Sequence, residues 1–339
     1  MQKPVTIALD AMSGDRGPAV IVPAAVASLD ADPDLRLILV GQPDTLERLL
    51  GGARQRFGER VAIEAAAQVV AMDEHPREAL RRKKQSSMRI AINLVRAGRA
   101  GACVSAGNTG ALMATARFVL RTLAGIDRPA IISAVPSLGG HTHMLDLGAS
   151  VDCTPEQLLQ FAVMGTVVAA DIHELKRPRV GLLNIGAEDI KGHDRIREAA
   201  QLLNDSQLNY IGFVEGNDIF QGTVDVVVTD GFTGNVSLKT MEGVAQLIST
   251  HLRAELSRNW RNRVLGLVAM PMLNSLKHTL DTRRYNGASL VGLNGIVIKS
   301  HGSADAAAFQ NAIRTAVVEA DQGVPRQIEH LLEDNPQAA

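Results

Sequence analysis

The sequence predicts an α/β fold in which helices cover both faces of a largely parallel sheet, giving three layers in the order α/β/α. Short apolar, β-branched runs alternate with helical stretches along the chain, as they do in parallel βαβ units. Several runs are apolar throughout, which is typical of strands that are covered on both faces. The chain has 339 residues with 46% hydrophobic content, so it can bury a sizeable core.

The predicted elements follow one another without a break. The runs with the composition of strands are Val5–Leu9, Leu35–Val40, Val61–Ala65, Ala102–Ser105, Ala130–Val135, Met144–Leu147, Val180–Asn184, Tyr210–Val214, Val224–Val228 and Ile296–Lys299. The predicted helices include Ala19–Leu29, Ser87–Ala97, Gly110–Leu120, Pro155–His173, Asp194–Leu203, Val236–Glu255 and Ser303–Glu319. No repeat or low-complexity linker occurs, so we expect residues 1–339 to form one continuous body without a clean domain boundary.

A basic amphipathic segment covers residues 256–284. The apolar face of this segment contains Leu265, Val268, Met272 and Leu276. Pro271 lies in the middle of the segment, and we expect it to divide the segment into two short helices at a protruding tip. The apolar face suits reversible contact with a membrane surface and equally suits packing in a dimer.

The charge balance argues against nucleic acid as a partner. The 35 Lys and Arg residues nearly cancel the 36 Asp and Glu residues, so no global field attracts a polyanion. No signal-peptide core is found, and no apolar run reaches the roughly 18 residues of a membrane-spanning helix. We therefore expect a cytoplasmic protein with peripheral membrane contact at most. Cys103 and Cys153 lack the spacing of zinc ligands, and we expect no metal or other cofactor.

Polar, glycine-rich clusters follow the predicted strands, at the end where open α/β sheets bind their ligands. They are Asp10–Asp15, Ser105–Ala111, Asp146–Ala149, Asn184–Gly192, Thr229–Asn235 and Lys299–Asp305. They come from distant parts of the chain, yet all lie at the same end of a strand. Their combination therefore predicts function more strongly than any single cluster does.

The cluster Ser105–Ala111 has the features of a phosphate site. It ends a strand and opens a helix, so backbone N–H groups and the helix dipole favour an anion there. It matches neither the GxGxxG pattern nor a Walker A loop, because no lysine follows Gly110. Nucleotide binding is therefore disfavoured.

Three other side chains in the clusters suit a reaction on an anionic substrate. Lys191 lies in a glycine-bracketed loop, although a lone lysine is more often a solvated surface residue. Asn235 is near a helix start, where capping by Thr233 or Asn235 is the simpler interpretation. His301 lies at a strand end beside glycine and serine, which makes it a candidate for catalysis or anion binding.

These residues, in this order, resemble the bacterial phosphate acyltransferase family (PlsX) over nearly the entire chain. Besides the clusters, the resemblance is carried by Arg81–Met88, Gly125–Ala130, Ser237–Thr240 and Gly287–Leu290. Two positions depart from the family pattern. Ser13 precedes Gly14 where the family has a double glycine, and Ser150 replaces an asparagine; we assign catalysis to neither.

The resemblance implies a fold similar to the isocitrate and isopropylmalate dehydrogenases and to phosphate acetyltransferase, in a homodimer. It implies transfer of a long-chain fatty acyl group from an acyl-carrier-protein thioester to inorganic phosphate. The product, acyl phosphate, would pass to a membrane glycerol-3-phosphate acyltransferase for phospholipid synthesis. Neither a metal nor an enzyme nucleophile is needed, because phosphate is itself a nucleophile and a thiolate is a tolerable leaving group.

For a direct attack of phosphate on the thioester, we predict the following roles for individual residues. Lys191, Asn108 and the amides of Thr109 and Gly110 would hold phosphate, and Asn235 would support the oxyanion.

Other residues of the clusters would assist. His301 is a reserve base or phosphate ligand. Asp10 and Asp15 would orient cationic groups, since their charge repels phosphate. Asp230 is a further candidate for substrate binding.

Acyl carrier protein is acidic, so basic side chains are candidates for docking it. They are Arg81, Arg82, Lys83, Lys84, Arg261 and Arg263. A run of charge is more often simply a solvated face.

Two other classes of function remain open. A dehydrogenase of the same fold would need metal-binding aspartates and a nicotinamide site, and it would change nicotinamide absorbance with a hydroxy acid. A non-catalytic membrane scaffold would keep the amphipathic segment but would not need the strand-end clusters. An assay of phosphate-dependent acyl transfer separates the scaffold from the enzyme.

Overall fold

The protein is described here by a computed structural model that covers residues 4–173, 175–188, 190–280, 286–335 and 338. Within these residues, eleven strands form one sheet in the order β3-β2-β1-β4-β11-β10-β5-β6-β9-β7-β8. The strands are β1 (Thr6–Asp10), β2 (Arg36–Gly41), β3 (Val61–Ala65), β4 (Ala102–Ser105), β5 (Ala130–Ser137), β6 (Gly140–Leu145), β7 (Arg179–Leu183), β8 (Asn209–Val214), β9 (Val226–Val228), β10 (Ala288–Val291) and β11 (Ile296–Lys299). Every predicted strand overlaps one of these, and only β10 was missed.

The sheet is mixed rather than largely parallel, and its two halves run in opposite directions. Strands β1, β2, β3, β4 and β11 are parallel to one another. Strands β6, β7, β8 and β9 are also parallel to one another. Between the halves, β10 is antiparallel to β11 and to β5, and β5 is antiparallel to β6. The carboxyl ends of the two halves therefore lie at opposite edges of the sheet.

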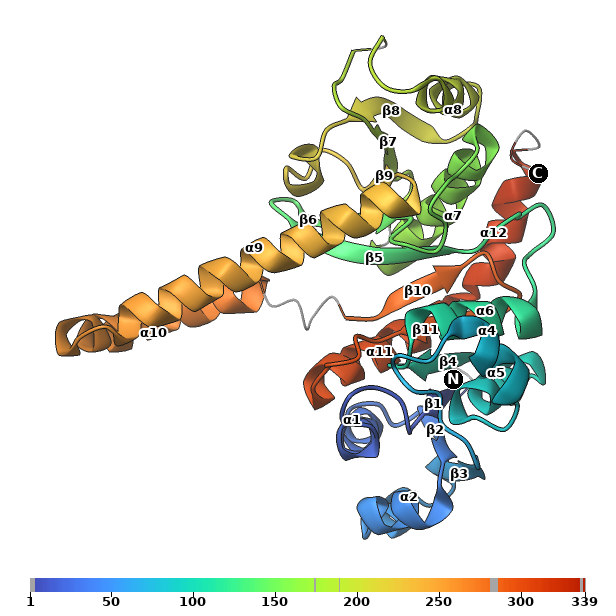
Figure 1. Cartoon of the computed structure of the whole chain (residues 1–339), viewed down its shortest axis with the longest axis vertical. Coiled ribbons are helices and arrows are strands. Elements are labelled where there is room, and N and C mark those ends of the chain that lie inside the picture. The colour runs from blue at the N-terminus through green and yellow to red at the C-terminus, as the bar shows by residue number, and fades with distance from the viewer. Residues whose placement is uncertain (1–3, 174, 189, 281–285, 336–337, 339) are drawn as a thin grey trace.

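Helices cover both faces of the sheet, which confirms the three-layer prediction (Figure 1). They are α1 (Pro18–Ala31), α2 (Pro43–Leu50), α3 (Ala53–Phe57), α4 (Pro76–Arg82), α5 (Ser87–Arg96), α6 (Thr109–Leu120), α7 (Pro155–His173), α8 (Asp194–Asn204), α9 (Gly231–Ser257), α10 (Trp260–Leu280), α11 (Ala306–Gln322) and α12 (Val324–Glu333). One layer contains α1, α2, α7, α8, α11 and α12. The other contains α4, α5, α6 and the beginning of α9.

The core is apolar on both faces of the sheet. Phe309 of α11 packs with Ile7 and Leu9 of β1 on one face. In the other half of the same layer, Phe161 of α7 packs with Leu145 of β6. This burial fixes the strand ends, and with them the polar clusters that follow.

Helices α9 and α10 form an antiparallel hairpin that extends away from the body (Figure 1). The prediction that Pro271 divides residues 256–284 into two short helices is wrong, because α10 continues through this position. Helix α9 also begins at Gly231, earlier than the predicted Val236. Among the described residues, no helix is long and apolar enough to cross a membrane.

Candidate active site

The strand-end clusters form two groups, because the halves of the sheet run in opposite directions. The β11 group consists of Asp10–Asp15, Ser105–Ala111 and Lys299–Asp305, at the ends of β1, β4 and β11. The β9 group consists of Asp146–Ala149, Asn184–Gly192 and Thr229–Asn235, at the ends of β6, β7 and β9. The structure thus separates Lys191, Asp230 and Asn235 from the phosphate candidates of the first group.

Lys299, the last residue of β11, is the cation of the β11 group. Burial and, to a smaller extent, the charge of Lys239 lower its pKa to about 8, although Asp15 and Asp10 act in the opposite direction. A partly buried lysine that feels a second lysine has too little negative charge around it, so it favours a bound anion. Neither lysine was singled out from the sequence, although a lysine that ends the apolar run Ile296–Lys299 is a visible signal.

Helix α9 links the two groups. Asn235 and Lys239 are four residues apart, so both lie on the same face of this helix. Lys239 is close enough to Lys299 to affect its pKa, and it also forms an ion pair of 2.7 Å with Glu242. The beginning of α9 therefore runs from the β9 group toward the β11 group.

Asp10 and two serines fix the loops of the β11 group. Asp10 is 1% exposed, and its Oδ2 accepts a hydrogen bond of 2.7 Å from Ser105 Oγ. Ser13 Oγ donates to the Asp10 carbonyl at 2.7 Å and accepts from Ala106 N at 2.9 Å. Burial raises the pKa of Asp10. This arrangement is consistent with an orienting role for Asp10.

At the first turn of α6, backbone N–H groups are available to an anion, whereas the side chain of Asn108 is already hydrogen-bonded. Asn108 Oδ1 caps the helix by accepting from Ala111 N at 2.9 Å. Its Nδ2 donates to the carbonyl oxygens of Met72, at 2.7 Å, and Glu74, at 3.2 Å. The amides of Thr109 and Gly110 are in the first turn, where N–H groups have no partner within the helix. An anion here would meet these amides.

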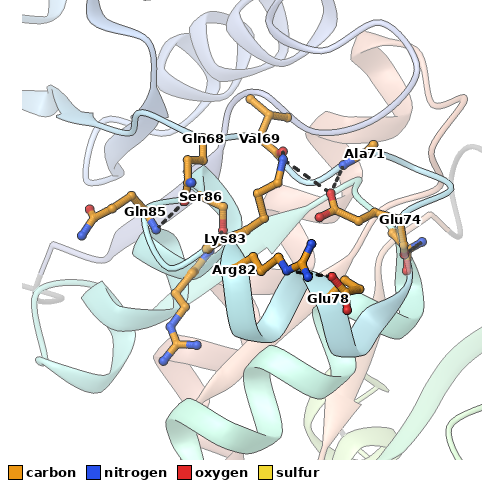
Figure 2. Close-up of polar contacts among 11 residues, drawn as sticks. Gln68, Val69, Ala71, Glu74, Glu78, Arg82, Lys83, Gln85 and Ser86 are labelled. Atoms are coloured by element: carbon orange, nitrogen blue, oxygen red, sulfur yellow. Dashed lines mark hydrogen bonds and ion pairs between the residues drawn. The ribbon is translucent and has the colours of Figure 1, made fainter.

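The basic run before α5 is partly structural, as Figure 2 shows. Lys83 Nζ donates to the carbonyl of Val69 at 2.9 Å and lies 3.7 Å from Glu74 Oε2. Lys83 therefore holds the loop that Asn108 contacts.

The basic neighbours of Lys83 differ in whether they form ion pairs. Arg82 pairs with Glu78 at 3.0 Å (Figure 2). Arg81 and Lys84 are exposed, and no ion pair involves them within the described residues. Only these two cations of the run are thus free to meet a partner.

His301 is positioned as a hydrogen-bond donor. Its Nδ1 accepts from Ser303 N at 3.3 Å and lies 2.8 Å from Ser303 Oγ. When the ring is neutral, the proton is therefore on Nε2. Its backbone N donates to Asn286 Oδ1 at 2.8 Å. A neutral ring of this tautomer suits a phosphate ligand better than it suits a base that acts through Nε2.

The beginning of α9 packs tightly in the β9 group. Asp230 caps the helix by accepting from Thr233 N at 2.8 Å and from Thr233 Oγ1 at 3.0 Å, so the cap is neither Thr233 nor Asn235. A Cβ on Gly231 would lie 2.6 Å from Asp146 Oδ2, and one on Gly234 would collide with the carbonyl of Asp146. Glycine is therefore required at both positions for close approach.

Asn235 is exposed next to Gly148. A Cβ on Gly148 would lie 3.4 Å from Asn235 Cβ. Within the described residues, no hydrogen bond involves the Asn235 side chain. Its amide is thus available to a substrate.

Lys191 is exposed, and its backbone hydrogen bonds lie within its own loop. Its carbonyl accepts from Asn184 Nδ2 at 3.2 Å, and its N–H donates to Glu188 O at 3.0 Å. In the part of the chain that the structure describes, no ion pair involves its ammonium. Lys191 could therefore act together with the β11 group only through a substrate that contacts both.

Neither cysteine has the environment of a nucleophile. Cys103 and Cys153 are buried, and burial raises the pKa of both thiols, that of Cys153 to about 12. A reactive cysteine needs the opposite shift. Searching the described residues finds no group of three or more His, Cys, Asp or Glu side chains that could hold a metal ion.

Nearly the whole chain matches a single protein family. A family model described as "Fatty acid synthesis protein" matches residues 5–327. A protein named phosphate acyltransferase from Alkalilimnicola ehrlichii is 60% identical over 98% of this chain and 97% of its own length. A protein of the same name from Methylococcus capsulatus is 58% identical over 97% of both chains.

Solved structures with low sequence identity share the fold. A phosphotransacetylase from Streptococcus pyogenes superimposes with a TM-score of 0.64 at 18% identity, over 94% of both chains. A branched-chain phosphotransacylase from Enterococcus faecalis has a TM-score of 0.57 at 15% identity, over 93% of this chain and 99% of its own. A 4-hydroxythreonine-4-phosphate dehydrogenase from Klebsiella pneumoniae has a TM-score of 0.51 at 15% identity, over 94% of this chain and 100% of its own. The predicted similarity to phosphate acetyltransferases and dehydrogenases is therefore confirmed at the level of fold.

Proposed function

The chain belongs to the fatty acid synthesis protein family of phosphate acyltransferases, and from this premise we propose that it transfers a fatty acyl group from an acyl-carrier-protein thioester to inorganic phosphate. It is an acyltransferase of lipid synthesis, so the dehydrogenase and the non-catalytic scaffold are set aside. The product would be acyl phosphate, which a membrane glycerol-3-phosphate acyltransferase would consume.

The observation that carries the proposal is a pair of lysines, Lys299 at the end of β11 and Lys239 on α9. Lys299 is partly buried, its pKa is lowered, and Lys239 lies within electrostatic range. The amides of Thr109 and Gly110 begin α6 in the same group of loops. Two cations and a helix N-terminus together suit a phosphate ion. Phosphate would bring negative charge to the partly buried ammonium of Lys299.

The remaining residues would act on the thioester. Asn235 would donate to the oxyanion that forms when phosphate attacks the carbonyl carbon, because its amide has no hydrogen bond within the described residues and it lies one helical turn before Lys239 on α9. His301 would donate from Nε2 to phosphate. Lys191 would contribute charge from its exposed loop once the substrate is bound. The thiolate of the carrier would leave, and phosphate oxygen would replace sulfur on the acyl carbon.

Product analysis tests this function. The purified protein is incubated with phosphate and a fatty acyl thioester of acyl-carrier protein, and acyl phosphate is trapped with hydroxylamine. We expect phosphate-dependent hydroxamate and free carrier thiol, with the same yield in EDTA. Activity that disappears in EDTA and returns with a divalent metal, or a protein that releases no thiol, would refute the proposal.

Acyl carrier protein would dock on basic side chains near the site. Arg81 and Lys84 are exposed and remain free of ion pairs among the described residues, whereas Arg82 and Lys83 are engaged. Arg81 lies in α4 and Lys84 follows it, directly after the loop that contacts Asn108 in the chain, so both are candidates to meet an acidic partner.

The α9–α10 hairpin presents two apolar surfaces to solvent. Helix α9 exposes Val244, Leu247, Ile248 and Leu252 at helical spacing. Helix α10 exposes Leu265, Val268 and Met272, and these side chains are 64%, 77% and 68% exposed. The side chain of Leu276 lies outside the described residues. We assign the α9 stripe to packing in a homodimer and the α10 surface, next to Arg261 and Arg263, to peripheral contact with a membrane.

A double substitution separates these assignments. Leu265→Glu with Val268→Glu places two carboxylates on the α10 surface, where burial in lipid would be strongly unfavourable. We expect less co-sedimentation with anionic liposomes, and unchanged turnover on soluble substrate. Analytical ultracentrifugation should give the wild-type mass. Loss of the dimer, with liposome binding retained, would instead assign this surface to packing.

A further inference from the structure

A loop that takes no part in the proposed mechanism lies against the proposed phosphate site. It covers residues 71–75 and leads into α4, which begins at Pro76. A Cβ on Gly302 would lie 2.7 Å from Met72 Cε, and a Cβ on Gly110 would lie 2.8 Å from Pro76 Cγ. Gly302 lies in the cluster after β11, and Gly110 is in the first turn of α6. The chain from Met72 to Pro76 therefore reaches from one cluster of the β11 group to another.

Side chains next to α4 and α6 hold this loop in place. Asn108 Nδ2 donates to the carbonyl oxygens of Met72 and Glu74, at 2.7 and 3.2 Å. Lys83 Nζ donates to the carbonyl of Val69 and lies 3.7 Å from Glu74 Oε2 (Figure 2). The backbone of Met72 is therefore fixed by the same residue that caps α6, the helix whose first amides would bind phosphate.

Met72 places an apolar group beside polar ones. A Cβ on Gly302 would lie 3.3 Å from Asp15 Oδ1 as well as close to Met72 Cε, so a side chain at this position would displace the methyl group of Met72. Met72 is also 42% exposed. Because stabilisation grows with the apolar area removed from water, so exposed a side chain adds little to the core. Its position suits control of solvent access instead.

Phosphate has to compete with water for the acyl group. Attack by a phosphate oxygen on the thioester carbonyl gives acyl phosphate, whereas attack by water gives the free fatty acid with loss of a proton. The carrier thiolate leaves in both cases. Water is far more concentrated than phosphate, so efficient transfer to phosphate requires a site that keeps water from the carbonyl carbon.

We propose that Met72 covers the entrance to the phosphate site and determines which acceptor takes the acyl group, by keeping water from the thioester. Its methyl group offers water no hydrogen bond, whereas the lysines and the α6 amides hold phosphate. Asn108 is then a positioning residue, because it holds the backbone of Met72 without touching substrate. The inference rests on the proposed function, since it assumes that phosphate is the acceptor.

The product ratio tests this role. Fatty acid and acyl phosphate are measured at early times with a fatty acyl thioester of acyl-carrier protein and saturating phosphate. A parallel incubation of acyl phosphate with each variant corrects for its own hydrolysis. In Met72→Ala the ratio of fatty acid to acyl phosphate should rise by roughly tenfold, which corresponds to about 1.4 kcal/mol in the barrier for attack by water. Met72→Leu keeps an apolar side chain of similar volume, so it should keep the wild-type ratio.

Asn108→Ser tests the positioning of the loop independently. Serine can still cap α6, but it has no amide to donate to the carbonyls of Met72 and Glu74. The loop should then lose its attachment to α6, and we expect the product ratio to rise as it does in Met72→Ala. A residue with a purely structural role would change the thermal midpoint and leave this ratio as it is.

The possible outcomes separate this inference from the function on which it rests. Wild-type product ratios in both Met72→Ala and Asn108→Ser, in an enzyme that forms acyl phosphate, would overturn the inference and leave the proposed function intact. A changed ratio in Asn108→Ser alone would assign the effect to the helix cap and would also overturn it. An unchanged ratio with a donor KM that rises with acyl-chain length in Met72→Ala would place the acyl chain against Met72 instead. A wild type that forms fatty acid but no acyl phosphate would contradict the proposed function itself.

Discussion

Replacement of Lys299 by methionine is expected to reduce kcat/KM for phosphate by roughly 10²–10³-fold, the usual effect of removing one preorganised donor from a developing charge. Lys299 is the partly buried cation of the β11 group, and the lowered pKa shows that its surroundings do not compensate its charge. For the same reason the folded state should lose no stability without it at neutral pH. We expect the thermal midpoint of Lys299→Met to equal or exceed that of the wild type.

The pH profile separates charge from shape at this position. The pKa of Lys299 is about 8, so its ammonium is present below pH 8 and is lost as the pH rises through this value. The KM for phosphate should therefore increase above pH 8 in the wild type. Lys299→Arg keeps its charge, so its phosphate KM should stay flat over the same range. A phosphate KM that is insensitive to pH in the wild type, or near-normal turnover in Lys299→Met, would remove Lys299 from the phosphate site.

Replacement of Asn235 by alanine is expected to lower turnover by roughly 10²–10³-fold, because it removes the proposed oxyanion donor. The fold should be unaffected, since Asn235 is exposed and its side chain has no hydrogen bond within the described residues. Lys191→Ala should also cripple turnover if its ammonium joins the bound substrate. The measurement is paired, with thermal midpoint and turnover for each variant.

Asp230→Ala is the matched control for Asn235→Ala. Asp230 caps α9 through Thr233, so its loss should lower stability by about 1 kcal/mol with a smaller effect on rate. Near-normal turnover of Asn235→Ala at saturating phosphate, or a rate loss that follows the thermal midpoint, would contradict the assignment. His301 would then be the next candidate.

The fold was predictable from sequence because each strand has a strong local signal. Runs such as Ala102–Ser105 and Val61–Ala65 are short and apolar, and they became strands with these bounds. Strand β10 was missed because Ala288–Val291 follows directly on Asn286 and Gly287, a pair typical of a turn.

The direction of the strands could not be read in the same way. Local composition does not depend on direction, so the clusters after β9 and after β11 looked equivalent although they face opposite edges. The available signal was the turn at residues 137–140, where two glycines join β5 to β6 as an antiparallel hairpin. The prediction of a helix break at Pro271 was wrong for a different reason. The packing of α10 against α9 maintains the helix despite a local cost of about 3 kcal/mol.

The site was only partly predictable, since a hydrogen-bonded side chain and a free one have the same sequence. Asn108 and Asp230 were both predicted to bind substrate, and in the structure the side chain of each caps a helix. Lys239 and Lys299 are far apart in sequence. The effect of the Lys239 charge on the pKa of Lys299 arises only because the fold brings α9 near the end of β11.

A rapid-quench experiment tests direct attack of phosphate on the thioester. The protein is mixed with an excess of the fatty acyl thioester of acyl-carrier protein in the absence of phosphate, and thiol release and intact protein mass are followed. Direct transfer predicts no burst of thiol and no acylated protein, with both thiol and acyl phosphate appearing once phosphate is added. One equivalent of thiol released before phosphate, together with a protein heavier by one acyl group, would show a covalent intermediate and contradict the account.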